Sequence, residues 1–296
     1  MPSNAVTVRF AVVYLDFKKM RRLASWVKER DRVLVMGALN VTPDSFYDGG
    51  RYLTPTDAIE RALQMGREGA DIIDVGGASS RPGAKPLSSI EELKRVIPVI
   101  EGVRNRSDVL LSVDTTRASV AKEAIACGVA IVNDISALRF DPEMAGIIAE
   151  GGVFVVLMHM LETPETMQDN PVYTDPVEEI KSFLAERIEA ALDSGVPRER
   201  IIIDPGIGFG KRLEHNLTIL RGLSSFTDLD VPILIGLSRK SFLGEILNLP
   251  AGERLEGTIA ANAVAVINGA DIIRVHDVKE GRRTADVARR LRNDEP

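Results

Sequence analysis

The sequence has 296 residues, of which 45% are hydrophobic and 27% are charged, as in ordinary soluble globular proteins. This length fits either two modest domains or one α/β barrel of usual size. The 37 basic and 43 acidic residues leave a net charge of −6, which argues against a large nucleic-acid-binding surface, and no apolar stretch reaches the about 18–20 residues needed to span a membrane.

The first thirty residues are the least regular part of the chain. Residues 5–15 are apolar and strand-like, although Arg9 interrupts them, and they lack the features of a cleaved leader peptide. We interpret residues 5–30 as a hairpin or a strand-plus-helix, and residues 1–32 as an extension that caps the main domain. The single cysteine, Cys127, excludes an intrachain disulfide and indicates a reducing, cytoplasmic location.

From residue 33 onward, short apolar runs alternate with amphipathic helical segments. Strand–helix alternation predicts a parallel sheet, and eight runs predict one (β/α)₈ TIM barrel over residues 33–296. An open, doubly wound sheet is the alternative, but no run is followed by a G-x-G-x-x-G fingerprint. The runs are residues 33–39, 71–75, 109–113, 129–132, 153–158, 201–203, 232–236 and 271–275, and helical periodicity covers 57–68, 88–104, 116–127, 175–194 and 254–268.

Polar residues stand at the carboxyl ends of nearly all of these runs. The run Ile201–Ile203, for example, ends on Asp204 and is followed by a loop rich in Pro and Gly. In a closed barrel such side chains converge on one mouth, where barrel enzymes place their active sites. The polar residues at the other ends include Asn40, Asp114, Asn133, His159, Ser238, Lys240, Arg274 and His276, whereas Asp74 lies within the second run.

Two kinds of chemistry are present among them. Carboxylates, an amide and one cation would suit a flat heterocycle with amino and carbonyl edges; these are Asp114, Asn133, Asp204 and Lys240. Arginine forks and neighbouring donors would suit phosphate or carboxylate oxygens; these are Asn40, Arg81, Arg274 and His276.

Structural roles are open for several of the same residues. Asp204 alone could anchor its loop or cap a helix, and His159 could be a buried core histidine. Asp134 and Asp277 each follow a better candidate directly, so they should point away from the site and be structural. His215 is expected to support the Gly-rich loop rather than take part in chemistry.

Eight motifs, in order, resemble the dihydropteroate synthase family over residues 33 to about 290. They are MGALNVTPDSFYDGG (36–50), DIIDVGGASSRPGA (71–84), SVDTTRASVA (112–121), VNDIS (132–136), MHMLETPETMQ (158–168), IIIDPGIGFGK (201–211), GLSRKSFLG (236–244) and RVHDV (274–278).

The resemblance implies a barrel enzyme that joins dihydropterin-CH₂-pyrophosphate to p-aminobenzoate and releases pyrophosphate, with Mg²⁺ as cofactor and a homodimer formed through C-terminal helices. The implied catalytic set is Asn40, Asp114, Asp204, Lys240, Arg274 and His276. Pterin positions are Asp114, Asn133, Asp204 and Lys240; pyrophosphate positions are Asn40, Ser80, Arg81, Arg274 and His276, with Asn40 also on the metal. The p-aminobenzoate positions are Asp44, Phe46, Ser80, Pro82, Lys240 and Ser241.

The chain departs from the family pattern in two loops. Where the family usually reads GGESTRPG, Ala78 replaces a carboxylate and Ser80 replaces a threonine but keeps a hydroxyl. Where it usually reads MHMRGTP, this chain has Leu161 and Glu162, which changes the charge near the mouth.

The strand ends carry no evident nucleophile–base pair, so the expected mechanism is a dissociative displacement that depends on positioning. Two alternatives remain. A pterin-binding methyltransferase barrel acting on methyltetrahydrofolate would share the pterin contacts but would have no use for Arg274, His276 and Lys240. A non-catalytic pterin-binding homologue would have lost turnover.

Overall fold

The computed structural model describes residues 17–42, 54–78 and 87–292. Within these ranges eight parallel strands lie side by side in the order β6-β5-β4-β3-β2-β1-β8-β7. An isolated parallel bridge between Ile203 and Ile233 joins β6 to the start of β7 and completes the circle. The strands are β1 (Leu34–Asn40), β2 (Ile72–Gly76), β3 (Leu110–Asp114), β4 (Ile131–Asp134), β5 (Phe154–Met158), β6 (Ile201–Asp204), β7 (Leu234–Gly236) and β8 (Ile272–Val275).

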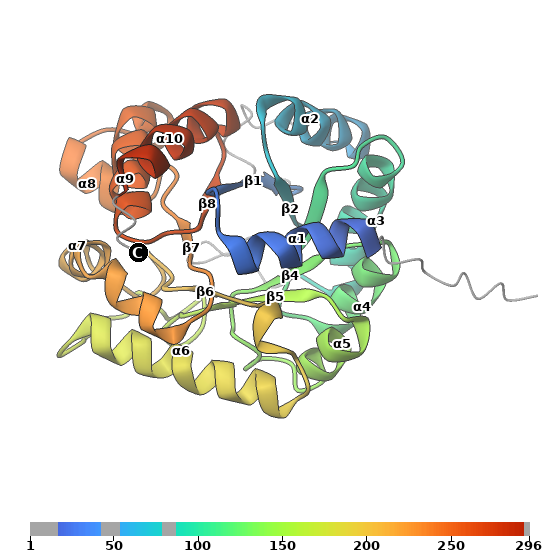
Figure 1. Ribbon diagram of the computed structural model, residues 1–296, viewed down its shortest axis with the longest axis horizontal. Coiled ribbons are helices and arrows are strands. Elements are labelled where there is room, and N and C mark those ends of the chain that lie inside the picture. The colour runs from blue at the N-terminus through green and yellow to red at the C-terminus, as the bar shows by residue number, and fades with distance from the viewer. Residues whose placement is uncertain (1–16, 43–53, 79–86, 293–296) are drawn as a thin grey trace, which may run out of the picture.

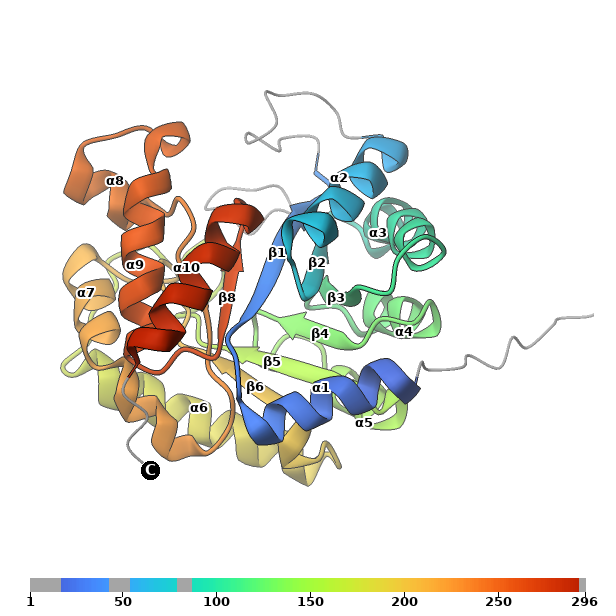
Figure 2. The same cartoon turned by 45° about the horizontal axis from the view of Figure 1, so that its top comes forward.

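Helices connect the strands and form the outer layer of the barrel (Figures 1 and 2). This confirms the predicted (β/α)₈ barrel, and each of the eight apolar runs contains or overlaps one strand. The helices are α1 (Phe17–Glu29), α2 (Pro55–Glu68), α3 (Ser89–Arg104), α4 (Ala118–Ala126), α5 (Met144–Gly151), α6 (Pro176–Asp193), α7 (Leu213–Arg221), α8 (Ser241–Leu247), α9 (Leu255–Ile267) and α10 (Val278–Leu291), with short 3₁₀ helices η2 (Arg198–Arg200), η3 (Leu223–Leu229) and η4 (Ala251–Glu253).

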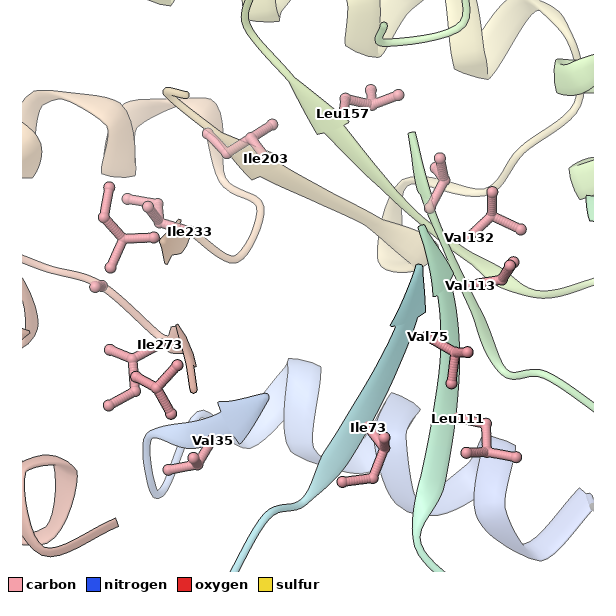
Figure 3. Packing of buried hydrophobic residues seen from close by; sticks show 14 of the residues in the cluster. Val35, Ile73, Val75, Leu111, Val113, Val132, Leu157, Ile203, Ile233 and Ile273 are labelled. Atoms are coloured by element: carbon pink, nitrogen blue, oxygen red, sulfur yellow. The ribbon is translucent and has the colours of Figure 1, made fainter. Parts of the chain in front are cut away.

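Alternation along each strand separates two faces. One set of strand side chains points outward and packs against the helices in the largest hydrophobic cluster, as Figure 3 shows for Val35, Ile73 and Val75 among others. The side chains between them point into the barrel. The same alternation therefore directs Asp74, Asp114 and Arg274 inward.

The amino-terminal half of the barrel interior is filled with apolar side chains. The first inward residues of the strands, such as Leu34, Ile72 and Phe154, form a second cluster with Trp26 and Leu23 of α1. Helix α1 lies across the strands rather than among the outer helices (Figure 1), and Trp26 Nε1 donates to the Arg32 carbonyl at 2.7 Å. The division at residue 32 into an extension and a barrel domain stays a prediction, because residues 1–16 lie outside the described ranges.

Local signals in the sequence explain where helices begin and end. Thr54 caps α2 through a capping box with Asp57, and Pro55 takes the first helical position. Gly69 follows the helix with φ of 105°, which glycine adopts without steric cost. Among the described residues, no helix is both long and apolar enough to cross a membrane.

Candidate active site

The inward side chains at the carboxyl ends of β2, β3, β4 and β8 form one hydrogen-bonded network. Arg274 Nε donates to Asp74 Oδ2 at 2.7 Å, and Arg274 Nη2 donates to Asp114 Oδ2 at 3.0 Å. Asn133 Nδ2 also donates to Asp74 Oδ2 at 3.0 Å. Asp74, which sequence reasoning did not select for the site, thus bridges Asn133 and Arg274, and Arg274 in turn binds Asp114.

Burial dominates the electrostatics of this network. It raises the pKa of Asp114 to about 7 against the opposing attraction of Arg274, and the neighbouring Asp74 adds to the rise. For Arg274, burial alone would lower the pKa, but the carboxylates of Asp74 and Asp114 outweigh it and raise the pKa. The guanidinium is therefore fixed as a cation, whereas Asp114 can change protonation near neutral pH.

A second cation faces the other side of the mouth. The Lys240 ammonium donates to the Ile207 carbonyl and lies 4.7 Å from the centre of the Phe209 ring. Burial lowers the pKa of Lys240 to about 8 against the attraction of Asp204. Burial also raises the pKa of Asp204, against the attraction of Lys240 above all, and Asp204 Oδ1 accepts from Gly206 N at 2.7 Å.

Two glycines, Gly76 and Gly236, lie between the side chains of the Arg274 network and their neighbours Asn40 and Lys240. A Cβ atom placed on Gly236 would lie 3.9 Å from both Lys240 Nζ and Arg274 Cβ. A Cβ atom on Gly76 would lie 3.5 Å from Asn40 Oδ1 and 3.5 Å from Asp114 Cβ. Asn40, Asp114, Arg274 and Lys240 therefore border one continuous region at the carboxyl mouth.

His276 and Ser241 complete the predicted residues that the structure describes. His276 Nδ1 lies 3.0 Å from Ser238 Oγ, at the end of β8. Ser241 is the first residue of α8, directly after Lys240, and is exposed. The remaining predicted residues lie outside the described ranges; they are Asp44, Phe46, Ser80, Arg81 and Pro82.

The residues expected to be structural do bind their own surroundings. Asp134 accepts from Ser136 N and Oγ and from Leu138 N, at 2.7–2.8 Å. Asp277 forms a two-point ion pair with Arg239, with both distances 2.9 Å. Both contacts agree with the prediction that these two carboxylates are structural.

His159 belongs to a buried cluster behind Asp204. Its ring packs edge-on against Phe183 at 4.8 Å, and its Nδ1 lies 2.9 Å from Lys211 Nζ. Burial, reinforced by the charges of Lys211 and Arg139, lowers the pKa of His159 far below its ordinary value, so the ring is neutral. His215 packs against Tyr173, whose hydroxyl donates to the Gly210 carbonyl at 2.9 Å, and this agrees with a supporting role for His215.

Sequence reasoning missed Asp74, Lys211 and Phe209. Asp74 lies within its apolar run and not at its end, so only the inward alternation of β2 could have selected it. Lys211 is only 4% exposed and donates to the Phe209 carbonyl at 2.9 Å. Its position at the end of a Gly-rich loop gave no sign of this burial.

The oxygen atoms at the mouth fit a magnesium ion that takes most of its ligands from a substrate and from water. Within the described residues, no three His, Cys, Asp or Glu side chains are grouped so as to hold a metal. Mg²⁺ keeps several waters and is bound through one or two protein oxygens together with substrate phosphates. The amide oxygen of Asn40, which borders the same position at Gly76 as Asp114, has the chemistry that such binding requires.

Comparisons with known proteins agree with this geometry. Residues 36–276 match the family described as pterin binding enzyme. Dihydropteroate synthase of Escherichia coli K12 is 47% identical over 246 residues, which cover 83% of this chain and 87% of that protein. A crystal structure of Yersinia pestis dihydropteroate synthase in complex with a sulfonamide drug superposes with a TM-score of 0.86 at 43% identity, covering 89% of this chain and 95% of that one.

A structure of the enzyme from Xanthomonas albilineans in complex with 7,8-dihydropteroate has a TM-score of 0.80 at 40% identity and covers 90% of this chain and 96% of that one. These matches span the strands and loops that carry the network around Arg274 and Lys240. The chain belongs to the pterin-binding dihydropteroate synthase family.

Proposed function

We propose that this protein condenses dihydropterin-CH₂-pyrophosphate with p-aminobenzoate to give dihydropteroate and pyrophosphate, as a transferase of folate biosynthesis. The observation that carries the proposal is the position of Arg274. Its guanidinium binds Asp74 and Asp114, Asp114 borders the same position at Gly76 as Asn40, and the positive charge of Arg274 acts on Lys240. The Arg274 cation therefore lies between the residues proposed to bind the heterocycle and those proposed to bind an anion.

The pterin ring is proposed to lie among Asp114, Asn133, Asp204 and Lys240. Carboxylates and an amide oxygen can accept from the amino and ring N–H groups, and Lys240 can donate to a ring acceptor. Because these groups are buried and partly satisfied by one another, a ligand that completes their hydrogen bonds gains more than it would in water. That difference would select a donor-rich ring.

Pyrophosphate is proposed to bind at Asn40, Ser80, Arg81, Arg274 and His276. Asn40 would supply one oxygen to the Mg²⁺ ion, which would neutralise charge on the leaving pyrophosphate. The p-aminobenzoate ring is proposed to bind beside Lys240 and Ser241, with Asp44, Phe46, Ser80 and Pro82.

The proposed reaction is a dissociative displacement at the exocyclic methylene carbon. The bond from this carbon to the pyrophosphate oxygen breaks first, and Arg274 and His276 stabilise the charge on the leaving oxygens. The pterin ring, held by Asp114 and Asp204, shares the positive charge left on the carbon. The amino nitrogen of p-aminobenzoate then forms the new C–N bond and releases its proton to solvent, so no strong base is required.

Two alternatives are distinguishable. A pterin-binding methyltransferase barrel would need no cation at Arg274, whereas here the cation is held by two carboxylates. A non-catalytic homologue would bind the pterin-pyrophosphate in calorimetry and give no dihydropteroate when p-aminobenzoate is added. A coupled assay of dihydropteroate formation, with and without Mg²⁺, separates both alternatives from the proposed activity.

The residue roles are tested by Asp114→Asn and Arg274→Ala, assayed separately. Each should lower turnover by at least about tenfold, the effect of ~1.4 kcal/mol of lost transition-state stabilisation. Asp193→Asn, at the exposed end of α6, is the matched control and should retain full turnover. Unchanged turnover in both site variants would refute the proposed roles.

We also propose a cytoplasmic homodimer. In support, α8, α9 and α10 lie together on one side of the barrel (Figure 2) and expose large apolar side chains. Sedimentation of Val264→Glu, on the outer face of α9, would test this: a dimer should become a monomer. The exposed apolar residues are Ile246, Leu247, Val264, Ile267, Val287 and Leu291.

A further inference from the structure

The loop between β7 and α8 contains a backbone conformation that its sequence does not favour. Arg239, directly before Lys240, has φ of 58°, in the left-handed region where residues with a Cβ atom are disfavoured. Such a conformation persists only where surrounding groups hold it. Because Lys240 follows at once, the left-handed residue decides the direction in which the Lys240 side chain leaves the loop.

Helix α9 and the segment before it hold this backbone from behind. The Arg239 amide donates to Thr258 Oγ1 at 3.0 Å. The Arg254 guanidinium bridges two consecutive main-chain carbonyls of the loop. Its Nη1 donates to the Arg239 carbonyl at 3.1 Å and to the Lys240 carbonyl at 3.2 Å. Arg254 Nε is itself fixed on the Leu249 carbonyl at 2.9 Å.

Helix α8 leaves space for this guanidinium. Gly244 lies inside α8, where glycine is less favourable than alanine. A Cβ atom at Gly244 would lie 2.1 Å from Arg254 Nη2 and 2.3 Å from Arg254 Cζ. Glycine is therefore required at position 244 to leave space for the Arg254 guanidinium, and not because the backbone there needs a glycine.

We propose that Arg254 is a positioning residue for Lys240: by bridging the carbonyls of Arg239 and Lys240, it holds the left-handed turn that directs the Lys240 ammonium toward Asp204. The inference rests on the proposed role of Lys240 in binding the pterin. Arg254 donates from behind the loop to main-chain carbonyls, so it acts through Lys240 and is not assigned a substrate contact.

The first test compares two substitutions of Arg254. Arg254→Gln loses the bridge and should lower kcat/KM by about tenfold or more, whereas Arg254→Lys keeps one donor and should stay within about threefold of the wild type. Arg198→Gln is the control, since Arg198 Nη1 also donates to a main-chain carbonyl, that of Leu229, but before β6 at the other end of the barrel. Its melting temperature should fall about as much, with kcat/KM unchanged.

The decisive test is a double-mutant cycle with Lys240→Met. If Arg254 acts through Lys240, Arg254→Gln should change kcat/KM by less than about twofold once the lysine is absent. Equal losses in both backgrounds would overturn the inference while leaving the role of Lys240 intact. Lys240→Met with wild-type kcat/KM would instead refute the proposed role of Lys240 itself.

Gly244→Ala provides an independent test, because it leaves Arg239, Lys240 and Arg254 unchanged in sequence. Its methyl group should displace the flexible guanidinium and reproduce the Arg254→Gln loss in kcat/KM, with a smaller fall in melting temperature than in Arg254→Gln because alanine favours the helix. Wild-type kcat/KM in Gly244→Ala would overturn the inference.

Discussion

Asp114→Asn should make the folded protein more stable at pH 8 although it impairs catalysis. The folded-state pKa of Asp114 is about 7, raised by burial from 3.8, so the folded protein binds a proton that the unfolded chain has already released. The stability that the Asp114 carboxyl contributes is therefore fully present below about pH 4 and is lost as pH rises from there to about 7. Asparagine has no such titration.

The magnitude follows from the two pKa values. A shift of about three units, at ~1.4 kcal/mol per unit, gives about 4 kcal/mol at pH 8. The Asp114 side chain retains 20% exposure, and water that reaches it reduces the penalty of ionisation, so we expect a gain of about 2–4 kcal/mol.

Urea unfolding at pH 4.5 and pH 8 measures this gain, with the same urea dependence assumed for both proteins. Asp193→Asn, which removes an exposed carboxyl, serves as the control and should change stability equally at both pH values. A gain in Asp114→Asn below ~1 kcal/mol at pH 8, or one of the same size at pH 4.5, would refute the argument that Asp114 is destabilised by burial.

Three further predictions concern other parts of the molecule. Trp26→Ala should cost about 3–5 kcal/mol in urea unfolding, because Trp26 is buried under the barrel; exposed Ser25→Ala is the control, and a cost below ~1 kcal/mol would contradict this packing. Glu162→Gly should raise stability by about 0.5–1 kcal/mol, since Glu162 has φ of 55°; a loss of stability would count against it. Because the Lys240 pKa is about 8, kcat/KM should fall above pH 8 in the wild type, and Lys240→Arg should lack this alkaline fall; an unchanged profile would exclude Lys240 as its source.

The barrel could be predicted because its signals are local. Runs such as Ile201–Ile203 combine β-branched residues with a following loop of Pro and Gly, and each such run is a strand. Helix α1 was less legible, because its packing against Leu34 and Ile72 depends on strands that come later in the chain.

The meeting of polar side chains from the strand ends at one mouth could also be predicted, whereas the hydrogen bonds between them could not. Asp114, Asn133 and Arg274 were selected by position, and the structure brings them together. Asp74 was missed because its importance depends on register: it lies level with Ser112 of β3 and is reached by Arg274 from β8, about two hundred residues away in sequence. Lys211 was missed because only the fold surrounds it with His159 and Phe209.

The junction between β6 and β7 is the thinnest seam of the barrel. One isolated bridge at Ile203 and Ile233, with the Ile203 amide bonded to the Pro232 carbonyl at 2.9 Å, is what joins them. In amide hydrogen exchange we expect the Ile203 amide to lose protection before those of β2 or β3, whose ladders are longer. Asp204 ends β6 and Lys240 follows β7, so local opening between these two strands would move apart two of the residues proposed to bind the pterin. A bound pterin should therefore slow hydrogen exchange at the Ile203 amide.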